Sequence, residues 1–208
     1  MAILIPAGAP GPLTLAARRP WAEFAYARWL MLACYLCLAL SCLASGADAP
    51  APAPGNVERN VKAAFLYKFL GYVEFGNGQE AAGPLTVGVL GAEDVAAELA
   101  RITSGRMVGT RPVVVRQLRE GDPLAGLHMV FVNGDAARQQ ALLRAAQQAG
   151  VLSVTDSEDG LELGGVINFR VVDDRVRFEV SMPAAEKSHL KLSSRLLAVA
   201  YQVKKGGP

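Results

Sequence analysis

The sequence predicts an α/β fold, in which a single domain holds a mostly parallel sheet of about six strands, with helices on both faces and an antiparallel hairpin at one edge. Two observations predict it. Short, continuous apolar runs alternate with segments of helical periodicity through the first two thirds of the folded region, as in buried parallel strands joined by helices. The run GGVINFRVVDDRVRFEV, residues 164–180, instead alternates apolar and polar residues on both sides of an Asp-Asp pair, as a hairpin does.

The first 47 residues are expected to be a signal peptide that is removed on export. Arg28 precedes the uncharged run WLMLACYLCLALSCLAS, and the small residues SGADA follow it. We expect cleavage after Ala47. The uncharged run is shorter than the roughly 20 residues that a membrane span needs, which weighs against an uncleaved anchor.

All three cysteines, Cys34, Cys37 and Cys42, lie inside this segment. Cys34 and Cys37 have the C-x-x-C spacing, but the apolar core of a signal peptide is unsuited to a redox pair. A lipoprotein attached through Cys42, which follows the small residue Ser41, is the alternative to a free exported protein. Cleavage after Ala47 leaves no cysteine, and a chain of about 160 residues buries enough surface to fold without disulfides.

The exported chain is expected to begin with an extended Pro/Ala linker over residues 48–56 and to fold over residues 57–205. Apolar residues recur at helical spacing from Val57 to Leu70, and Gly71 follows them. The folded part is therefore predicted to open with a helix.

Strands and helices alternate in the segment that follows. Short apolar runs predict strands over residues 85–90, 111–118, 128–132 and 151–155. Helices are predicted over residues 92–103, where acidic residues fill the first turn, and 135–148, where Asp135 caps the start and Gly150 follows the end.

A two-residue turn at Asp173-Asp174 sets the register of the hairpin. Apolar residues then face apolar residues across the pair, and Arg170 faces Arg177 on the polar side. The apolar pairs are Val171 with Val176, Phe169 with Phe178, and Ile167 with Val180. Gly164 and Gly165 come before this strand, whereas the glycines of a phosphate loop follow a strand and open a helix, so they are predicted to form a bend or a close packing point.

The C-terminal region is predicted to be helical. Pro183 suits the start of a single turn over Met182–Lys187. A last helix, with Ser188 as its cap and Ser193 and Ser194 in its first turn, is predicted from a stripe of apolar residues: Leu192, Leu196, Val199, Ala200 and Val203.

Composition and motifs argue against several classes of function. The net charge is +2, and beyond residue 47 there are 18 basic and 18 acidic residues, so a nucleic-acid binder is not expected. No nucleotide-loop, hydrolase-elbow or metalloprotease motif occurs. His128 is interpreted as a strand-end histidine, His189 lacks an orienting partner, and the acidic cluster TDSEDG does not have EF-hand spacing. We expect no catalytic residue, cofactor or metal.

Several segments together resemble the YfiR-like family of bacterial periplasmic proteins. They are VKAAFLYKFLGYVEF, PLTVGVLG, VLSVTD, ELGGVINFRVVDDRVRFEV and AAEKSHLKLSSRLLAVA, between residues 57 and 201. The residues that match the family pattern, and that we interpret as structural, are Gly164, Gly165, Asn168, Phe169, Ala184, Ala185, Leu190, Ser193, Ser194 and Leu196.

The resemblance implies a small periplasmic domain, often dimeric, that has no catalytic activity and regulates a membrane-bound signalling enzyme. The best known member restrains an inner-membrane diguanylate cyclase through its periplasmic sensor, and an outer-membrane-linked partner relieves the restraint. This chain is therefore expected to lower cyclic-di-GMP signalling, and with it biofilm formation. Some relatives use cysteine pairs in the folded domain for redox control, which this chain lacks.

Two surfaces are candidates for the partner. One is the arginine face of the hairpin, formed by Arg170, Arg175 and Arg177. The other is an exposed apolar patch on the first helix, formed by Phe65, Tyr67, Phe69 and Tyr72. The alternative function is a small-ligand sensor with a pocket at the carboxyl ends of the strands, near Gly91, Gly134 and Asp156. A hydrolase is a third alternative, and the lack of a nucleophile motif opposes it.

Overall fold

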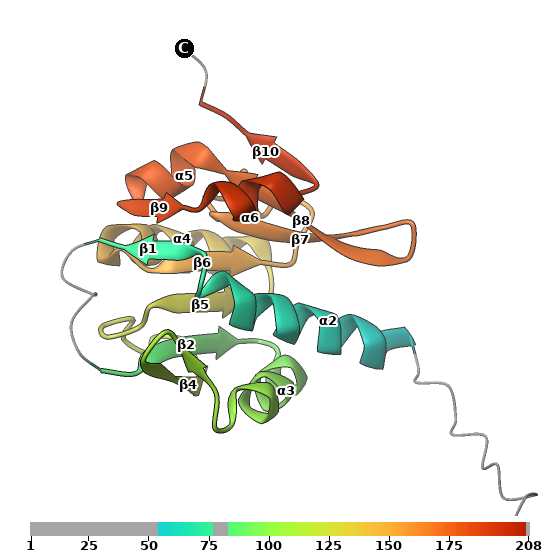
Figure 1. Ribbon diagram of the computed structural model, residues 1–208. Helices are drawn as coiled ribbons and strands as arrows, with labels where there is room; N and C mark the ends of the chain where they lie inside the picture. The colour runs from blue at the N-terminus through green and yellow to red at the C-terminus, as the bar shows by residue number, and fades with distance from the viewer. Residues whose placement is uncertain (1–53, 77–82, 207–208) are drawn as a thin grey trace, which may run out of the picture. The chain divides into compact units, whose positions relative to one another are not determined.

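The computed structural model describes residues 54–76 and 83–206 (Figure 1). The expected signal peptide and its three cysteines lie outside the described residues. In chain order the elements are α2 (Pro54–Phe69), β1 (Val73–Phe75), β2 (Leu85–Leu90), α3 (Glu93–Thr103), β3 (Met107–Val108), β4 (Arg111–Leu118), β5 (Met129–Val132), α4 (Ala136–Ala149), β6 (Leu152–Thr155), β7 (Ile167–Val172), β8 (Arg175–Ser181), α5 (Met182–Lys187), β9 (Leu190–Leu192), α6 (Ser194–Val199) and β10 (Gln202–Lys204). Helix α2 begins at Pro54, so the last three residues of the expected linker are helical.

The main sheet is larger and more mixed than predicted, with eight strands in the order β10-β8-β7-β6-β5-β2-β4-β3. Its centre, β7-β6-β5-β2-β4, is parallel as expected. The hairpin β7–β8 is not at the edge, because β10 pairs in parallel outside β8. At the other end, β3 adds an antiparallel strand to β4. Two- and three-residue strands carry too little periodicity to be found in the sequence, which explains the error.

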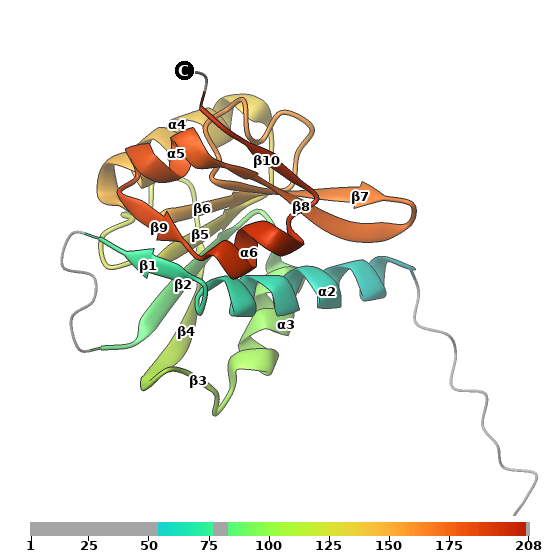
Figure 2. The same cartoon turned by 45° about the horizontal axis from the view of Figure 1, so that its top comes forward.

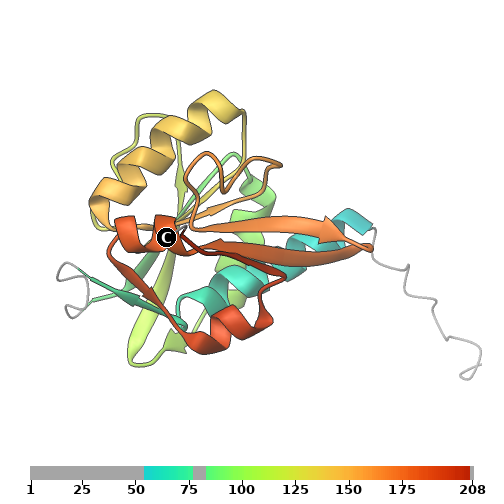
Figure 3. The same ribbon diagram turned by 90° about the horizontal axis from the view of Figure 1, so that it is seen from above.

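The core lies on both faces of this sheet. Strand β5 shows why, since Met129 and Phe131 point into one apolar cluster while Val130 and Val132 point into a second. Helices α2, α3, α5 and α6 contribute to the first cluster and α4 to the second. Figure 3 shows α4 on one side of the sheet and α2 and α6 on the other. The prediction of helices on both faces is confirmed.

The C-terminal segment is not one long helix, so that prediction is wrong. Ser193 has an extended backbone, and its side chain accepts from the Arg195 amide, which starts the short helix α6. Before it, β9 pairs with β1 in a separate two-stranded sheet (Figure 2). After it, Ala200 is extended and the chain enters β10. Ser188 caps the end of α5 instead of the start of the last helix.

The hairpin has the register that the sequence predicts, with Phe169 opposite Phe178 and Arg170 opposite Arg177. Asp173 and Asp174 have φ values of 49° and 55°, as the two central residues of a type I′ turn require. This turn twists in the same sense as the strands that it joins.

Among the described residues, none of the helices is long and apolar enough to cross a membrane.

Candidate functional site

The most prominent surface feature is the outer part of the hairpin, residues 169–178, which we call the hairpin arm. Strand β6 pairs with β7 only at residues 167 and 168, and β10 pairs with β8 only from residue 179 onward. The arm therefore extends past its neighbouring strands, as Figure 2 shows. Val171 belongs to the apolar side of the hairpin, but it is 56% exposed because the core ends before it.

The three predicted arginines of the hairpin have different surroundings. Arg170 is held, since it donates to the Glu158 carbonyl over 3.1 Å and its Nε lies 3.9 Å from a carboxylate oxygen of Glu179. Arg175 and Arg177 are exposed and have no carboxylate partner among the described residues. These two, rather than Arg170, are available for an acidic surface.

The aromatic residues of α2 do not form the exposed patch that the sequence predicts. Phe69 is 1% exposed, and the rings of Phe65 and Phe69 pack against Phe169 and Phe178 with centroids 5.0 to 6.2 Å apart. These four rings join α2 to the base of the hairpin. The helix therefore supports the arm from inside.

The remaining two aromatics lie elsewhere. The Tyr67 hydroxyl donates to the Met107 carbonyl over 3.0 Å, which ties α2 to β3. Tyr72 follows α2 and is 37% exposed, so it alone of the four is an exposed large apolar residue.

The family-pattern residue Asn168 holds the loop between β6 and β7. Its side chain is completely buried, and its Oδ1 accepts from the Thr155 hydroxyl over 2.8 Å and from the Ser157 amide over 3.3 Å. Its Nδ2 donates to the Ser157 carbonyl over 2.9 Å. A Cβ on Gly160 would lie 2.4 Å from Oδ1, so only glycine fits there. We call this group the Asn168 latch.

Gly164 and Gly165, predicted to form a bend or a close packing point, differ in their geometry. Gly164 has a φ of 109°, which makes the bend. A Cβ on Gly165 would lie 2.7 Å from the Gly160 carbonyl oxygen, so this residue is a close packing point. The other family-pattern residues also sit in the framework, either buried or at the start of α6: Phe169, Ala184, Ala185, Leu190, Ser193, Ser194 and Leu196.

A buried lysine, which sequence analysis missed, joins α2 to the same loop. Lys62 is 6% exposed and makes ion pairs with Glu58 and Asp156. Burial by itself would lower the pKa of Lys62, but the hydrogen bonds and charges of Asp156 and Glu58 outweigh it and raise the pKa above the ordinary lysine value. A lysine four residues after a glutamate at the start of a helix was the available signal.

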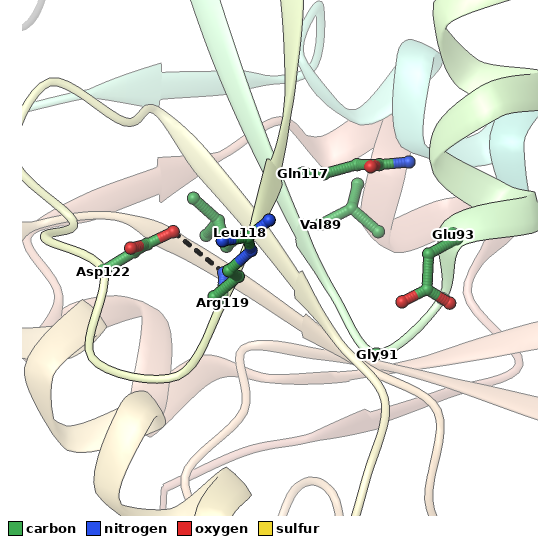
Figure 4. A pocket seen from close by; sticks show the side chains of 8 residues that line it. Val89, Gly91, Glu93, Gln117, Leu118, Arg119 and Asp122 are labelled. Atoms are coloured by element: carbon green, nitrogen blue, oxygen red, sulfur yellow. Dashed lines mark hydrogen bonds between the residues drawn. The ribbon is translucent and has the colours of Figure 1, made fainter.

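The structure separates the three residues of the predicted ligand pocket. Gly91 lines a cavity of about 530 Å³ at the carboxyl ends of β2 and β4, where Glu93 and Asp122 stand on opposite sides (Figure 4). Asp156 lines a smaller cavity of about 270 Å³ together with Arg170. The Gly134 carbonyl accepts from the Gln139 side chain, and Gly134 lines neither cavity.

The larger cavity is lined by polar side chains that are exposed or half-buried. Glu93, Gln117 and Arg119 are exposed, and the Asp122 carboxylate already accepts from the Arg119 amide over 2.8 Å. Directly beside it, the β2–β5 crevice is closed, because a Cβ on Gly91 would lie 2.0 Å from the Asn133 carbonyl oxygen. The cavity offers two carboxylates, the Gln117 amide and the Arg119 guanidinium to a polar ligand.

The two histidines lie at the start of a strand and in a turn. His128 is 7% exposed at the start of β5, with its ring nitrogens 3.2 Å from the Thr86 amide and 2.8 Å from the Arg111 guanidinium. This confirms it as a strand-end histidine. His189 is exposed in a left-handed turn, and the neighbouring Ser188 hydroxyl donates to the Ala184 carbonyl.

Comparison with known proteins gives the family. The family model described as YfiR/HmsC-like matches residues 59–201. The chain belongs to this family. The resemblance seen in the sequence is therefore confirmed at the level of family. The YfiR/HmsC-like proteins are periplasmic regulators rather than enzymes. No match was found among curated proteins.

Two solved structures are similar to part of this YfiR/HmsC-like chain. A conserved domain protein from Vibrio cholerae O1 biovar eltor has a TM-score of 0.46 at 13% identity, over 70% of this chain and 60% of that one. The ABC domain from Streptococcus pneumonia in complex with L-Trp has a TM-score of 0.41 at 13% identity, over 57% of this chain and 55% of that one. The chain thus spans less than two thirds of either protein, and the likeness carries no functional argument.

Proposed function

We propose that this chain is a periplasmic, non-catalytic regulator that binds the periplasmic part of an inner-membrane diguanylate cyclase and lowers cyclic-di-GMP production. Membership of the YfiR/HmsC-like family supports this proposal. The observation that carries it in this chain is the hairpin arm. The arm presents an exposed valine and two arginines without carboxylate partners among the described residues, on a strand pair that extends beyond the sheet.

The arm suits a partner that contacts both of its sides, with apolar groups against the valines and acidic groups against the arginines. Val171 and the partly exposed Val176 lie on one side of the arm, while Arg175 and Arg177 lie on the other. Desolvation of the valines contributes affinity, and the arginines orient the complex and increase its rate of formation. A regulator that binds only the inactive arrangement of a sensor shifts the sensor toward it by its difference in affinity for the two arrangements.

The proposal is tested by replacing the arm residues in the full chain. Arg175→Glu together with Arg177→Glu is expected to abolish restraint and raise cellular cyclic-di-GMP toward the level of a gene deletion. The matched control is Arg144→Glu, an exposed arginine of α4 without a carboxylate partner among the described residues. Unchanged cyclic-di-GMP after deletion of the gene contradicts the regulatory function itself. A normal response with the double variant contradicts only the arm.

A small-ligand sensor is the second candidate function, and the cavity shown in Figure 4 favours it. It lies at the carboxyl ends of parallel strands, where open α/β sheets bind their ligands. Two carboxylates, Glu93 and Asp122, stand against one guanidinium, Arg119, so the cavity favours a polar ligand that carries a net positive charge. A ligand that binds only the folded chain raises Tm, and Glu93→Gln should weaken that shift. A polar-metabolite screen in which no compound raises Tm removes this candidate.

A further inference from the structure

The far end of the main sheet presents a strand edge that no described strand covers. Strand β3 pairs with β4 only at Arg111 and Pro112, and β2 lies on the other side of β4. Residues 113–118 therefore have one side without a strand partner among residues 54–76 and 83–206. Such an edge offers alternating backbone donors and acceptors to another extended chain.

A groove runs beside this edge. Its cavity of about 450 Å³ is bounded by the C-terminal end of α3 on one side and by β3 and the first half of β4 on the other. Met107 is 56% exposed and Val114 is 42% exposed, so its rim is apolar. The Thr103 hydroxyl in its wall already donates to the Leu99 carbonyl over 2.8 Å. We call this surface the β4 groove.

Two arginines at the β4 groove and its edge have no carboxylate partner among the described residues: Arg106 and Arg116. Arg106 lines the groove, and its guanidinium lies 5.9 Å from the centre of the Tyr67 ring. Arg116 lies in β4 itself, two residues after Val114. By contrast, Arg101 on α3 is paired with Glu98 over 2.7 Å. The groove and its edge therefore carry uncompensated positive charge.

We propose that the β4 groove binds an extended, acidic segment of a partner protein, which adds to the sheet as a further strand next to β4. The open edge supplies main-chain hydrogen bonds, and the groove between a strand and a helix accepts alternate apolar side chains, as in strand-addition complexes. The unpaired arginines select acidic side chains. This goes beyond the proposed regulation of a cyclase and does not depend on it, because no residue of the hairpin arm takes part.

A second copy of this chain is the less suitable occupant. Pairing β4 with β4 of another copy brings two sets of unpaired arginines to one interface, and like charges across a strand pair are unfavourable. Exposed arginines also deter such edge-to-edge association in general. Charge thus favours an acidic partner over self-association.

The test uses the full chain and a synthetic peptide of about eight residues with alternating glutamate and valine or threonine. Backbone amide shifts on titration are expected at residues 113–118 and at Met107. The same peptide with lysine in place of glutamate should bind at least about tenfold more weakly. Two further peptides are N-methylated, one at its odd and one at its even residues. Because alternate amides of a strand point to opposite edges and only one edge pairs with β4, one of these peptides should lose binding and the other should keep it.

Variants of the protein complete the test. Arg106→Glu together with Arg116→Glu should reverse the preference, so that the lysine peptide binds more tightly than the glutamate peptide. Arg144→Glu on α4 and Arg175→Glu on the hairpin arm are matched controls that should leave both affinities within about twofold. Both arginines of the test variant are exposed, and its Tm reports whether the fold is retained.

Three results would overturn the proposal. One is equal affinity for the two peptides, which makes the arginines merely protective of the edge. Another is a set of amide shifts located on the hairpin arm or around Glu93. The third is a concentration-dependent dimer that Arg116→Glu alters while neither peptide binds, which assigns the groove to a second copy.

Discussion

Replacing Asn168 by alanine should destabilise the protein by about 2–4 kcal/mol. The substitution removes three hydrogen bonds, of 2.8, 3.3 and 2.9 Å, from a completely buried side chain. Each such bond contributes about 0.5–1.5 kcal/mol net, and a group left without a partner in the interior costs more. The loss is moderated because Ser157 is partly exposed and because the Thr155 hydroxyl keeps a second acceptor, the Ile167 carbonyl, at 3.3 Å.

The assay is urea unfolding at equilibrium, with the slope m held in common between the variants. Hydrogen exchange at residues 156–166 should also increase, since the latch holds that loop. Asn133→Ala, at an exposed asparagine, is the control and should change stability by less than about 0.5 kcal/mol. In a double-mutant cycle, Thr155→Val and Asn168→Ala should show a coupling of about 0.5–1.5 kcal/mol. The latch is refuted if Asn168→Ala lowers the free energy of unfolding by less than about 0.5 kcal/mol, or if hydrogen exchange at residues 156–166 stays at the wild-type rate.

Three further substitutions test other parts of the framework. Lys62→Met should lower the free energy of unfolding by about 1–3 kcal/mol near neutral pH, because it removes the cation that pairs with Asp156. The pKa of Lys62 is raised in the folded state, so this difference should persist below pH 10.5 and shrink as the pH rises beyond it. Urea unfolding at a series of pH values measures it. Gly165→Ala should cost about 1–3 kcal/mol through a 2.7 Å approach to a carbonyl oxygen, whereas Gly55→Ala, with open space around it, should not lower Tm. Asp174→Gly should stabilise the turn by about 0.5 kcal/mol because its φ is positive, and a lower Tm would contradict the I′ assignment.

Local patterns in the sequence were sufficient for the elements that bury a long, regular face. The hairpin register followed from apolar residues meeting on both arms, and β2 and β4 have the predicted bounds. Asp135 caps the start of α4, and Gly150 ends the helix in the left-handed conformation. Both ends could be predicted because each is set by a single residue whose type is visible in the sequence. The period of two or of 3.6 residues was long enough in each case to identify the element.

The C-terminal segment failed because its structure is decided by distant partners. Strand β9 is three residues long and exists because β1 lies beside it, and β10 exists because β8 has an open edge there. Of the predicted apolar stripe only Leu196 and Val199 lie in the six-residue helix α6, while Leu192 belongs to β9 and Val203 to β10. Tertiary pairing overrides propensity in segments this short.

The candidate sites were predicted less well, for a related reason. Phe65 and Phe69 looked like an exposed patch because a single helix does not reveal which neighbour covers it, and here Phe169 and Phe178 do. The β4 groove was invisible in the sequence, since an open edge is a property of strand order. The division of the hairpin arginines also needed the structure, because Glu158 and Glu179 hold only Arg170.

Helix α2 is the element common to the hairpin arm and the β4 groove, which lie toward opposite ends of the sheet order. Phe65 packs against Phe178 at the base of the arm, and Tyr67, two residues later, bonds the Met107 carbonyl at the rim of the groove. Two partners can therefore occupy the surfaces without competing for the same residues. If a ligand in the β4 groove changes the affinity of the hairpin arm for its partner, that partner must change the affinity of the groove for its ligand by the same factor. Tyr67→Phe removes only the hydroxyl bond, so it separates coupling through α2 from two surfaces that act independently.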